Sequence, residues 1–292
     1  MSINSFMQTN PAIFILVAGL LGLIVGSFLN VVIHRLPKMM EAEWRSQCIE
    51  MMGTQGPPPL PSQTYTLAYP ASHCPQCGHR LKVRDNIPVL SYLWLKGKCR
   101  YCHQVISARY PLVEILSGVM TAVVAWHFGW SPQAVFGAVL TWALLCLSFI
   151  DFDTHYLPDV ITLPFLWLGL GCNLFGIFAT LESSVTGAMS GYLSLWIIYQ
   201  GFKLATGKEG MGYGDFKLAA LFGAWLGWQM LPAVIIVAAF MGSLVGIALM
   251  TLLRRDKDVP LPFGPYLSVA GWFTLLWGQE ITDLYLGWIG MP

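Results

Sequence analysis

Long uncharged apolar segments constrain the fold of this 292-residue chain more than any other feature. The first segment, Pro11–Ile33, has no charged side chain anywhere along its length. A membrane-spanning helix needs about 20 mostly apolar residues, so this segment is long enough to cross a bilayer. It is not typical of a cleaved signal peptide, because no basic residue precedes it and its apolar run is too long. Only 11% of the residues are charged, against about 25% in a soluble domain, which argues against a soluble globular protein.

The pattern predicts an all-α polytopic membrane protein with about eight transmembrane helices. Residues 1–33 hold the first helix, residues 34–109 form a polar loop, and residues 110–292 form a seven-helix core. The loop contains the Pro-rich connector Gly56–Pro61, which is incompatible with a helix interior. The seven later segments are predicted near Tyr110–Phe128, Pro132–Ile150, Pro158–Ala179, Val185–Phe202, Tyr213–Gln229, Leu231–Leu253 and Leu261–Trp277. Tyr213–Gln229 is the weakest of these, and it places Asp215 within the membrane boundary.

All sixteen basic residues lie on one side of this predicted topology. Ten fall between Arg35 and Arg109, three between Lys203 and Lys217, and the last three are Arg254, Arg255 and Lys257. Basic residues near membrane spans stay cytoplasmic, so this face is predicted to be cytoplasmic and both termini lie on the other side. A net charge of +1 gives no reason to expect a nucleic-acid partner. The sequence leaves the oligomeric state open.

Four of the seven cysteines form two Cys-x-x-Cys pairs within the polar loop, Cys74 with Cys77 and Cys99 with Cys102. The stretch Gly78–Lys98 separates the pairs, a spacing close to that of a zinc ribbon. Disulfides or free thiols are the alternatives, but a cytoplasmic location disfavours stable disulfides. Four cysteine ligands leave no open position for substrate, so we expect one structural zinc ion that helps a loop with little core to fold.

Other residues near this loop are weaker candidates. Three histidines flank the cysteines and are alternative ligands: His73, His79 and His103. The remaining cysteines are interpreted as ordinary apolar residues: Cys48, Cys146 and Cys172.

Two carboxylates, Asp151 and Asp215, each adjoin an apolar segment on the predicted cytoplasmic side. Ionisable groups at membrane depth are costly and usually face a functional polar cavity. A helix bundle can bring the two together, and carboxylates that share one proton can hydrolyse a peptide bond, one accepting a proton from water and the other donating to the carbonyl oxygen. The pair titrates as a unit, so neither role is assigned to one residue. Gly212 and Gly214 would allow close approach of a substrate backbone and unusual φ values beside Asp215.

A structural interpretation of the acidic residues stays open. Asp153, Asp159 and Asp215 are also compatible with helix capping, because Asp favours helix N-termini. Asp159 follows Pro158 at a predicted helix start and fits capping as well as catalysis. Glu114, in the first turn of a predicted span, is interpreted as structural.

The ordered set of motifs resembles the bacterial type IV prepilin leader peptidases, membrane aspartic peptidases with a Gly-x-Gly-Asp motif. The resemblance runs nearly end to end: it begins with Gly26–Pro37 and includes both cysteine pairs. It continues through Asp151–Asp159 and closes on Gly212–Asp215. The family's catalytic pair maps onto Asp151 and Asp215, with Asp153 as a supporting residue.

The resemblance implies a multi-pass protein of the bacterial inner membrane that cleaves the basic leader from type IV prepilins and type II secretion pseudopilins. Cleavage would follow a Gly at the cytoplasmic face and leave a new N-terminal residue, usually Phe. The family then methylates that amine with S-adenosylmethionine. No Gly-rich nucleotide fingerprint for this cofactor is present, so its site would lie in the loop between Arg35 and Arg109, near Lys96-Gly97-Lys98.

Two other function classes compete. A proton-coupled transporter would also use Asp residues at membrane depth, although here they lie at segment ends and not mid-span. A lipid phosphotransferase would use Asp151, Asp153 and Asp159 as Mg²⁺ ligands.

Overall fold

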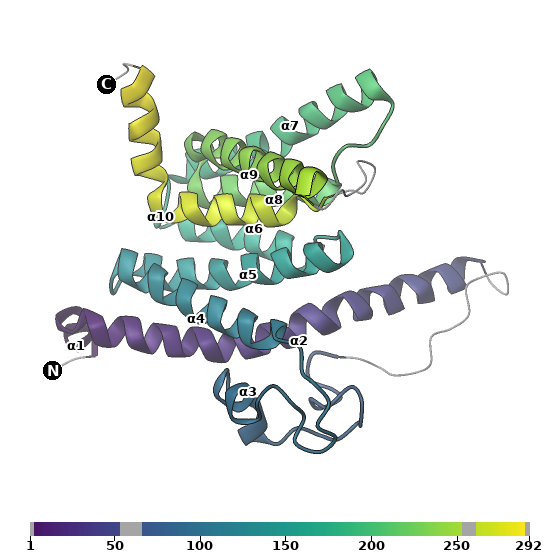
Figure 1. Cartoon of the computed structure of the whole chain (residues 1–292). Coiled ribbons are helices and arrows are strands. Elements are labelled where there is room, and N and C mark those ends of the chain that lie inside the picture. The colour runs from purple at the N-terminus through teal and green to yellow at the C-terminus, as the bar shows by residue number, and fades with distance from the viewer. Residues whose placement is uncertain (1–2, 53–65, 253–260, 290–292) are drawn as a thin grey trace. The chain divides into compact units, whose positions relative to one another are not determined.

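The computed structural model describes residues 3–52, 66–252 and 261–289 (Figure 1). Within these residues the chain is helical, with no β-strand and only two isolated β-bridges. The chain divides into two compact units, Met1–Trp126 and His127–Pro292. The predicted connector Gly56–Pro61 and the basic cluster Arg254–Lys257 lie outside the described residues.

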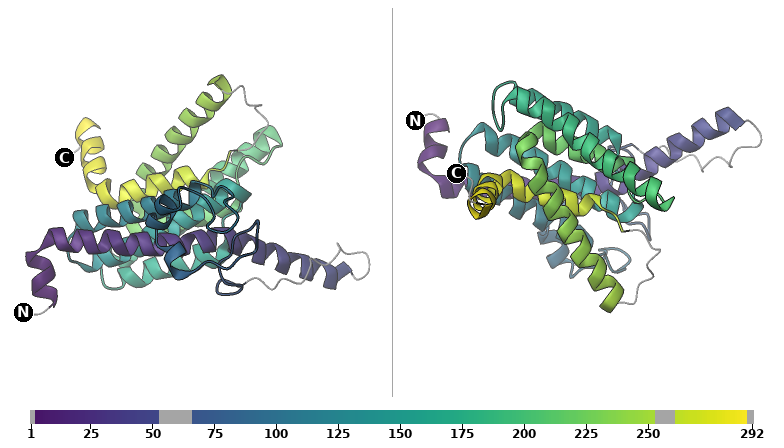
Figure 2. Two further views of the ribbon diagram at one scale, coloured as in Figure 1. Left: turned by 60° about the horizontal axis from the view of Figure 1, so that its bottom comes forward. Right: turned by 90° about the horizontal axis from the view of Figure 1, so that it is seen from above.

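The first unit contains α1 (Ile3–Thr9), α2 (Pro11–Met52), the 3-10 turn η2 (Val83–Asn86), α3 (Leu90–Trp94) and most of α4 (Arg109–Phe128). The helix α2 does not end with the apolar run at Ile33 but continues through the charged residues to Met52, and Figure 2 shows its length in two further views.

Small residues bring α2 and α4 into close contact. A Cβ added at Gly22 would lie 2.6 Å from Thr121 Oγ1, and one at Gly26 would lie 2.8 Å from Glu114 Cα. The Ser117 hydroxyl donates to the Gly22 carbonyl oxygen at 2.6 Å. Helices in lipid associate through such small-residue contacts and interhelical hydrogen bonds, because lipid provides no hydrophobic drive to join them.

The second unit contains α5 (Pro132–Thr154), α6 (Asp159–Asn173), α7 (Leu181–Thr206), α8 (Tyr213–Leu226), the 3-10 turn η3 (Trp228–Met230), α9 (Leu231–Leu252) and α10 (Gly264–Ile289). Capping residues set several of these ends. The Ser131 hydroxyl accepts from Ala134 N at the start of α5, and Gly207 ends α7 with a φ of +70°. Figure 1 shows α10 bending, and its one non-helical residue is Trp277.

Helix α8 is the core of the second unit. It contacts α6, α7, α9 and α10, and most of its side chains are buried. Gly187 and Gly191 of α7 let the α8 backbone approach at Gly223 and Ala219. Because α8 is apolar on most sides, it is stable only when its neighbours cover those sides, and the contacting helices do so.

A helix occupies each of the eight positions predicted as spans, but four are long and apolar enough to cross a membrane by themselves. These candidate spans are Pro11–Met52, Arg109–Phe128, Pro132–Thr154 and Trp228–Thr251. The helix α8 has 14 residues and α6 has 15, both shorter than the predicted segments. The structure therefore supports an integral membrane protein with four candidate spans among the described residues.

Candidate active site and metal centre

Asp151 lies in the last turn of α5, where that helix ends at the left-handed residue His155. Asp151 is 5% exposed, so the surrounding helices bury the carboxylate almost completely. One oxygen, Oδ2, accepts a hydrogen bond from the backbone N–H of Gly264 at 3.0 Å. The start of α10 therefore fixes the orientation of this side chain.

Gly264 is a site residue that the sequence analysis missed. A Cβ at this position would lie 2.6 Å from Asp151 Oδ2 and 3.2 Å from Leu157 Cδ1, so only glycine fits beside the carboxylate. Its one sequence signal is its place between Phe263 and Pro265 at the start of an apolar segment.

Asp215 lies in the first turn of α8 and is 7% exposed. Its Oδ2 accepts from the backbone N–H of Gly212 at 3.3 Å, which is the contact that an acidic residue makes when it caps a helix start. Asp151 and Asp215 are close enough to interact as like charges. Leu157 lies beside both sites, against Gly214 and near the position of Gly264.

The two glycines before Asp215 do not have the predicted unusual φ values. Gly212 has a φ of −84° and a ψ of 151°, which is ordinary extended backbone, and Gly214 is not among the positive-φ glycines. Gly214 is instead required by packing, because a Cβ there would lie 2.8 Å from Leu157 Cβ. A Cβ added at Gly212 would meet nothing closer than Asp215 Oδ2 at 3.7 Å.

The other acidic candidates, Asp153 and Asp159, are less buried than Asp151 and Asp215. Asp153 is exposed on α5, close in sequence to the buried Asp151. Asp159 begins α6 and forms an ion pair with Lys217 of α8, whose Nζ lies 2.7 Å from both carboxylate oxygens. This pair joins the starts of α6 and α8, a structural role that needs no metal ion.

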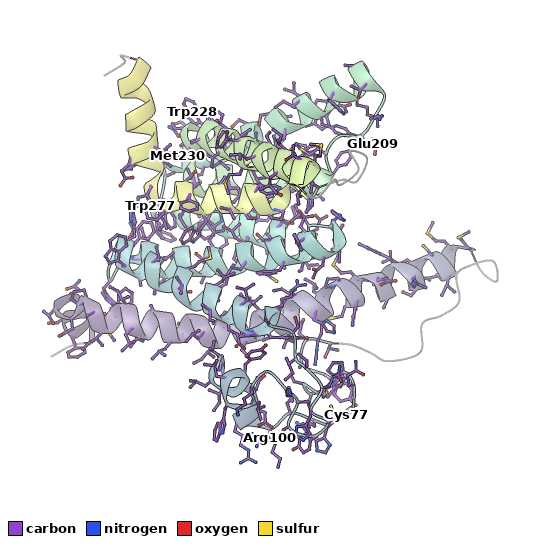
Figure 3. The ribbon with its side chains drawn as sticks, in the orientation of Figure 1. Cys77, Arg100, Glu209, Trp228, Met230 and Trp277 are labelled. Carbon is purple, nitrogen blue, oxygen red and sulfur yellow. The ribbon has the colours of Figure 1, made fainter. Side chains whose placement is uncertain are left out.

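The four predicted zinc ligands come together in the first unit. The sulfur atoms of Cys74, Cys77, Cys99 and Cys102 all lie within 4.8 Å of one another. Figure 3 labels Cys77 and Arg100 on this loop. The cluster draws on both cysteine pairs, as the spacing predicted.

The two cysteine pairs have the same backbone structure. Cys74 N donates to His79 O at 3.0 Å, and Cys99 N donates to Gln104 O at 2.8 Å. Each turn is closed by an isolated β-bridge, His73 with Arg80 and Lys98 with Val105. Because these backbone contacts of the first pair have counterparts in the second, the two Cys-x-x-Cys turns form two equivalent knuckles.

This sulfur geometry fits zinc. Zn–S bonds of about 2.3 Å in a tetrahedron place sulfur atoms about 3.8 Å apart, and Cys74 Sγ lies 3.8 Å from Cys102 Sγ. Backbone N–H groups of Cys102 and Tyr101 hydrogen-bond to the Cys99 sulfur and lower its pKa to about 7, which favours the thiolate that binds metal. A zinc ion bound here would cross-link the loop and supply folding energy.

A part-buried ion pair supports the second knuckle, and the sequence analysis missed it. Arg100 Nε donates to Asp85 Oδ1 at 2.8 Å, and the Asp85 side chain is 1% exposed. The hydrogen bond from Arg100 holds the pKa of Asp85 below its usual value. Nothing in the local spacing of these two residues indicates the contact.

The remaining histidines and cysteines near the loop are not part of the cluster. His79 stacks on Tyr101 with ring centroids 3.6 Å apart, and His73 Nδ1 lies 3.0 Å from the Ala71 carbonyl oxygen. Cys146 and Cys172 are buried in helices of the second unit, as expected of apolar residues, whereas Cys48 is exposed on α2.

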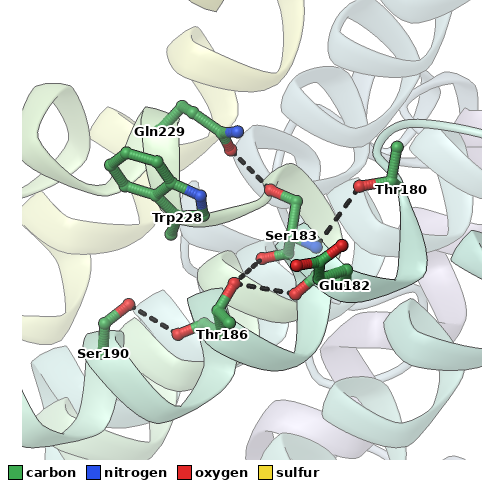
Figure 4. A pocket seen from close by; sticks show the side chains of 7 residues that line it. All are labelled: Thr180, Glu182, Ser183, Thr186, Ser190, Trp228 and Gln229. Atoms are coloured by element: carbon green, nitrogen blue, oxygen red, sulfur yellow. Dashed lines mark hydrogen bonds between the residues drawn. The ribbon is translucent and has the colours of Figure 1, made fainter.

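A cavity of about 600 Å³ lies at the other end of α8 from Asp215 (Figure 4). Its lining combines the start of α7 with η3: Thr180, Glu182, Ser183, Thr186, Ser190, Trp228 and Gln229. The distance along α8 between the two ends is about 20 Å. The cavity holds one carboxylate and no close acidic pair, so it does not compete with Asp151 and Asp215 as a hydrolytic site.

Comparisons with known proteins identify the family of the chain. Residues 20–128 match the model of the bacterial peptidase A24 N-terminal domain, and residues 138–247 match the type IV leader peptidase family. A protein of Pseudomonas aeruginosa named prepilin leader peptidase/N-methyltransferase is 51% identical over 99% of each chain. Proteins of the same name from Stutzerimonas stutzeri and Dichelobacter nodosus are 51% and 48% identical over 96% and 98% of each chain. No solved structure matches the chain.

With relatives that are about half identical over nearly its whole length, the chain belongs to the type IV leader peptidase family.

Proposed function

We propose that this protein is a bifunctional prepilin leader peptidase and N-methyltransferase in which Asp151 and Asp215 hydrolyse the peptide bond. The observation that carries the proposal is the geometry of the pair. Both carboxylates are buried, Leu157 packs beside a glycine next to each of them, and each has one oxygen held by a glycine N–H. A relative that matches over nearly the full length of both chains is named for both activities, which supports the same assignment for this protein.

The hydrogen bonds suggest how the pair works. Gly264 N–H and Gly212 N–H each occupy Oδ2 of one aspartate, which leaves the Oδ1 atoms available for water and for the shared proton. The ionised carboxylate accepts a proton from the attacking water, and the neutral one donates to the carbonyl oxygen of the scissile bond. Because the two groups titrate as a unit, the roles belong to the pair and not to one residue.

The proposed substrates are prepilins and pseudopilins, and the proposed membrane topology explains how they reach the site. We infer eight spans, with α6, α7, α8 and α10 completing the four candidate spans, and an active site that faces the cytoplasm of the inner membrane. A substrate with a basic leader keeps its charge in the cytoplasm and its apolar helix in lipid. The junction between these parts then lies at the depth of Asp151 and Asp215.

The methyl transfer is proposed for the zinc-binding loop of the first unit, with S-adenosylmethionine as donor, by analogy with relatives that carry both activities in their name. Zinc in the four-cysteine site would hold this loop in its folded form.

The experiment uses the full chain in lipid nanodiscs with a purified prepilin, and mass spectrometry of the product N-terminus reports scission and methylation together. We expect Asp151→Asn and Asp215→Asn each to lower cleavage by about 10²–10⁴-fold, because each removes one partner in proton transfer. Asp153→Asn is the control, since that side chain is exposed on α5 and should leave cleavage near wild type. Cleavage by both Asp151→Asn and Asp215→Asn at the wild-type rate would refute the aspartic mechanism.

The transporter hypothesis has no comparable support. The relatives are named as a peptidase and methyltransferase, and the two carboxylates lie at helix ends. The phosphotransferase hypothesis requires three Asp ligands around one ion, but Asp159 pairs with Lys217 and Asp153 is exposed.

A further inference from the structure

The short helix α3 of the first unit carries an apolar face without protein cover. Ile87, Leu90, Leu93 and Trp94 are 40%, 64%, 65% and 74% exposed. Leu90, Leu93 and Trp94 are spaced by three or four residues and lie along one side of α3, and Ile87 lies just before the helix. Four large apolar side chains exposed together on so short a segment require an apolar environment.

The other side of α3 is fixed against the second knuckle. The Tyr92 hydroxyl donates to the Ile106 carbonyl oxygen at 3.4 Å, and its ring lies over Gly97, where a Cβ would be 3.0 Å from the hydroxyl oxygen. The exposed apolar face is therefore held outward by packing on the opposite side.

The position of α3 along α4 gives its depth. The backbone N–H of Val89, which precedes α3, donates to Glu114 Oε2 at 2.8 Å. Glu114 lies in the second turn of α4, which begins at Arg109 and is a candidate span. At about 1.5 Å per residue, Val89 lies about 7 Å along the span from its polar end.

Helix α2 gives a similar depth through its contact with the same residue, Glu114. Gly26 lies against Glu114, so α3 begins level with Gly26. The apolar run of α2 continues beyond Gly26 to Ile33, about 10 Å further along the helix. Arg35, just past this run, donates to the carbonyl oxygens of Thr66 and Pro70 and marks the polar side.

We propose that Ile87–Trp94 is a membrane-inserted element of the loop, whose apolar face lies among the lipid acyl chains of one leaflet beside α2 and α4. We infer that lipid covers this apolar face, because the residue before α3 contacts α4 at the level of Gly26 in α2. Both helices are candidate spans, and at this depth hydrocarbon surrounds the protein. Exposed basic residues on both sides of it, Arg84 and Lys96, are placed to bind lipid phosphates. Trp94 suits the boundary between headgroups and acyl chains. The element attaches the zinc-binding loop to the bilayer without spanning it.

The test measures the depth of Leu93 in the full-length protein in nanodiscs. A fluorescent amino acid replaces Leu93 in one sample and Gln76 in the other, two exposed positions on the same loop, and the zinc content verifies that each loop is folded. Lipids brominated in their acyl chains quench from the membrane, and iodide quenches from water.

We expect the brominated lipids to quench the label at position 93 several-fold more than the label at position 76, and iodide to show the reverse. Equal access of iodide to both positions would overturn the proposal, because α3 would then lie in water. A label at position 93 that neither quencher reaches would also overturn it, because a protein surface such as a second copy would then cover α3.

Discussion

The aspartate site and the four-cysteine site are built in opposite ways. Asp151 and Asp215 are held by buried helices, and their orienting hydrogen bonds come from backbone N–H groups at helix starts. The cysteines lie on turns of a loop with two short helical segments, η2 and α3, and few buried apolar residues. The first site depends on packing among helices, whereas the second depends on what binds at its centre. The two should therefore fail under different treatments.

Removal of metal gives the largest expected difference between the sites. Cys74→Ser, Cys99→Ser or a strong chelator should reduce zinc from about one ion per chain to near zero, because a four-cysteine site needs every ligand. We expect methylation to be lost and leader cleavage to persist, at least in part. Elemental analysis and mass spectrometry of the processed pilin measure these outcomes.

Zinc loss should also depend on pH. Protons compete with the metal for the sulfurs, and the pKa of Cys99 is lowered to about 7 whereas that of Cys102 is raised to about 11, so zinc affinity should weaken as the pH falls. Simultaneous loss of both activities on metal removal would break the comparison, because the aspartate site would then depend on the loop.

A methyl group at Gly264 should affect only the aspartate site. The Cβ of Gly264→Ala would lie 2.6 Å from Asp151 Oδ2 and must displace the carboxylate. A displacement of about 1 Å in a catalytic group can cost about 10²-fold in rate, and we expect a loss of that order in cleavage with zinc content unchanged.

Gly201→Ala on α7 is the matched control for this substitution, because nothing lies within 4 Å of the added Cβ. It should leave cleavage unchanged. Equal rates for Gly264→Ala and Gly201→Ala would show that Asp151 does not need the close approach of α10.

Loss of the ion pair beside the second knuckle should affect only the metal site. Asp85→Asn removes the charge that Arg100 contacts next to Cys99, and we expect zinc affinity to fall by about tenfold, as for other residues that orient metal ligands. Competition with a chromogenic chelator measures the affinity. Glu41→Gln removes an exposed ion pair with Arg45 and should leave the affinity unchanged.

The smallest effect tests the equivalence of the two knuckles. Gly78 and His103 occupy equivalent positions with φ values of +67° and +56°. A left-handed conformation costs a non-glycine residue about 1 kcal/mol, so Gly78→Ala should destabilise the loop by about that amount and His103→Gly should stabilise it similarly. Thermal unfolding of the zinc-bound protein measures both, and changes of the same sign would contradict the equivalence.

The sequence predicted the parts of the molecule that depend on local spacing. Two Cys-x-x-Cys pairs define their own turns, and apolar segments define helix positions, so both could be identified without a structure. Gly264 could not, because its contact with Asp151 joins residues 113 positions apart in the sequence. The lengths of the helices were also beyond prediction. Helix α2 extends to Met52 through charged residues, none of them buried beyond Leu36, which hydropathy does not indicate. Helix α6 ends at Asn173, whose side chain hydrogen-bonds α7, α8 and the following loop.

The length of α8 has a consequence for water at the site. Its 14 residues make a helix of about 21 Å, against a hydrocarbon thickness of about 30 Å. Its neighbour α7 has 26 residues, and Asp215 lies in the first turn of α8 with 7% of its surface exposed. In the proposed eight-span topology a helix this short cannot reach both headgroup regions, so the water that the proposed hydrolysis consumes has to reach Asp215 below the lipid surface.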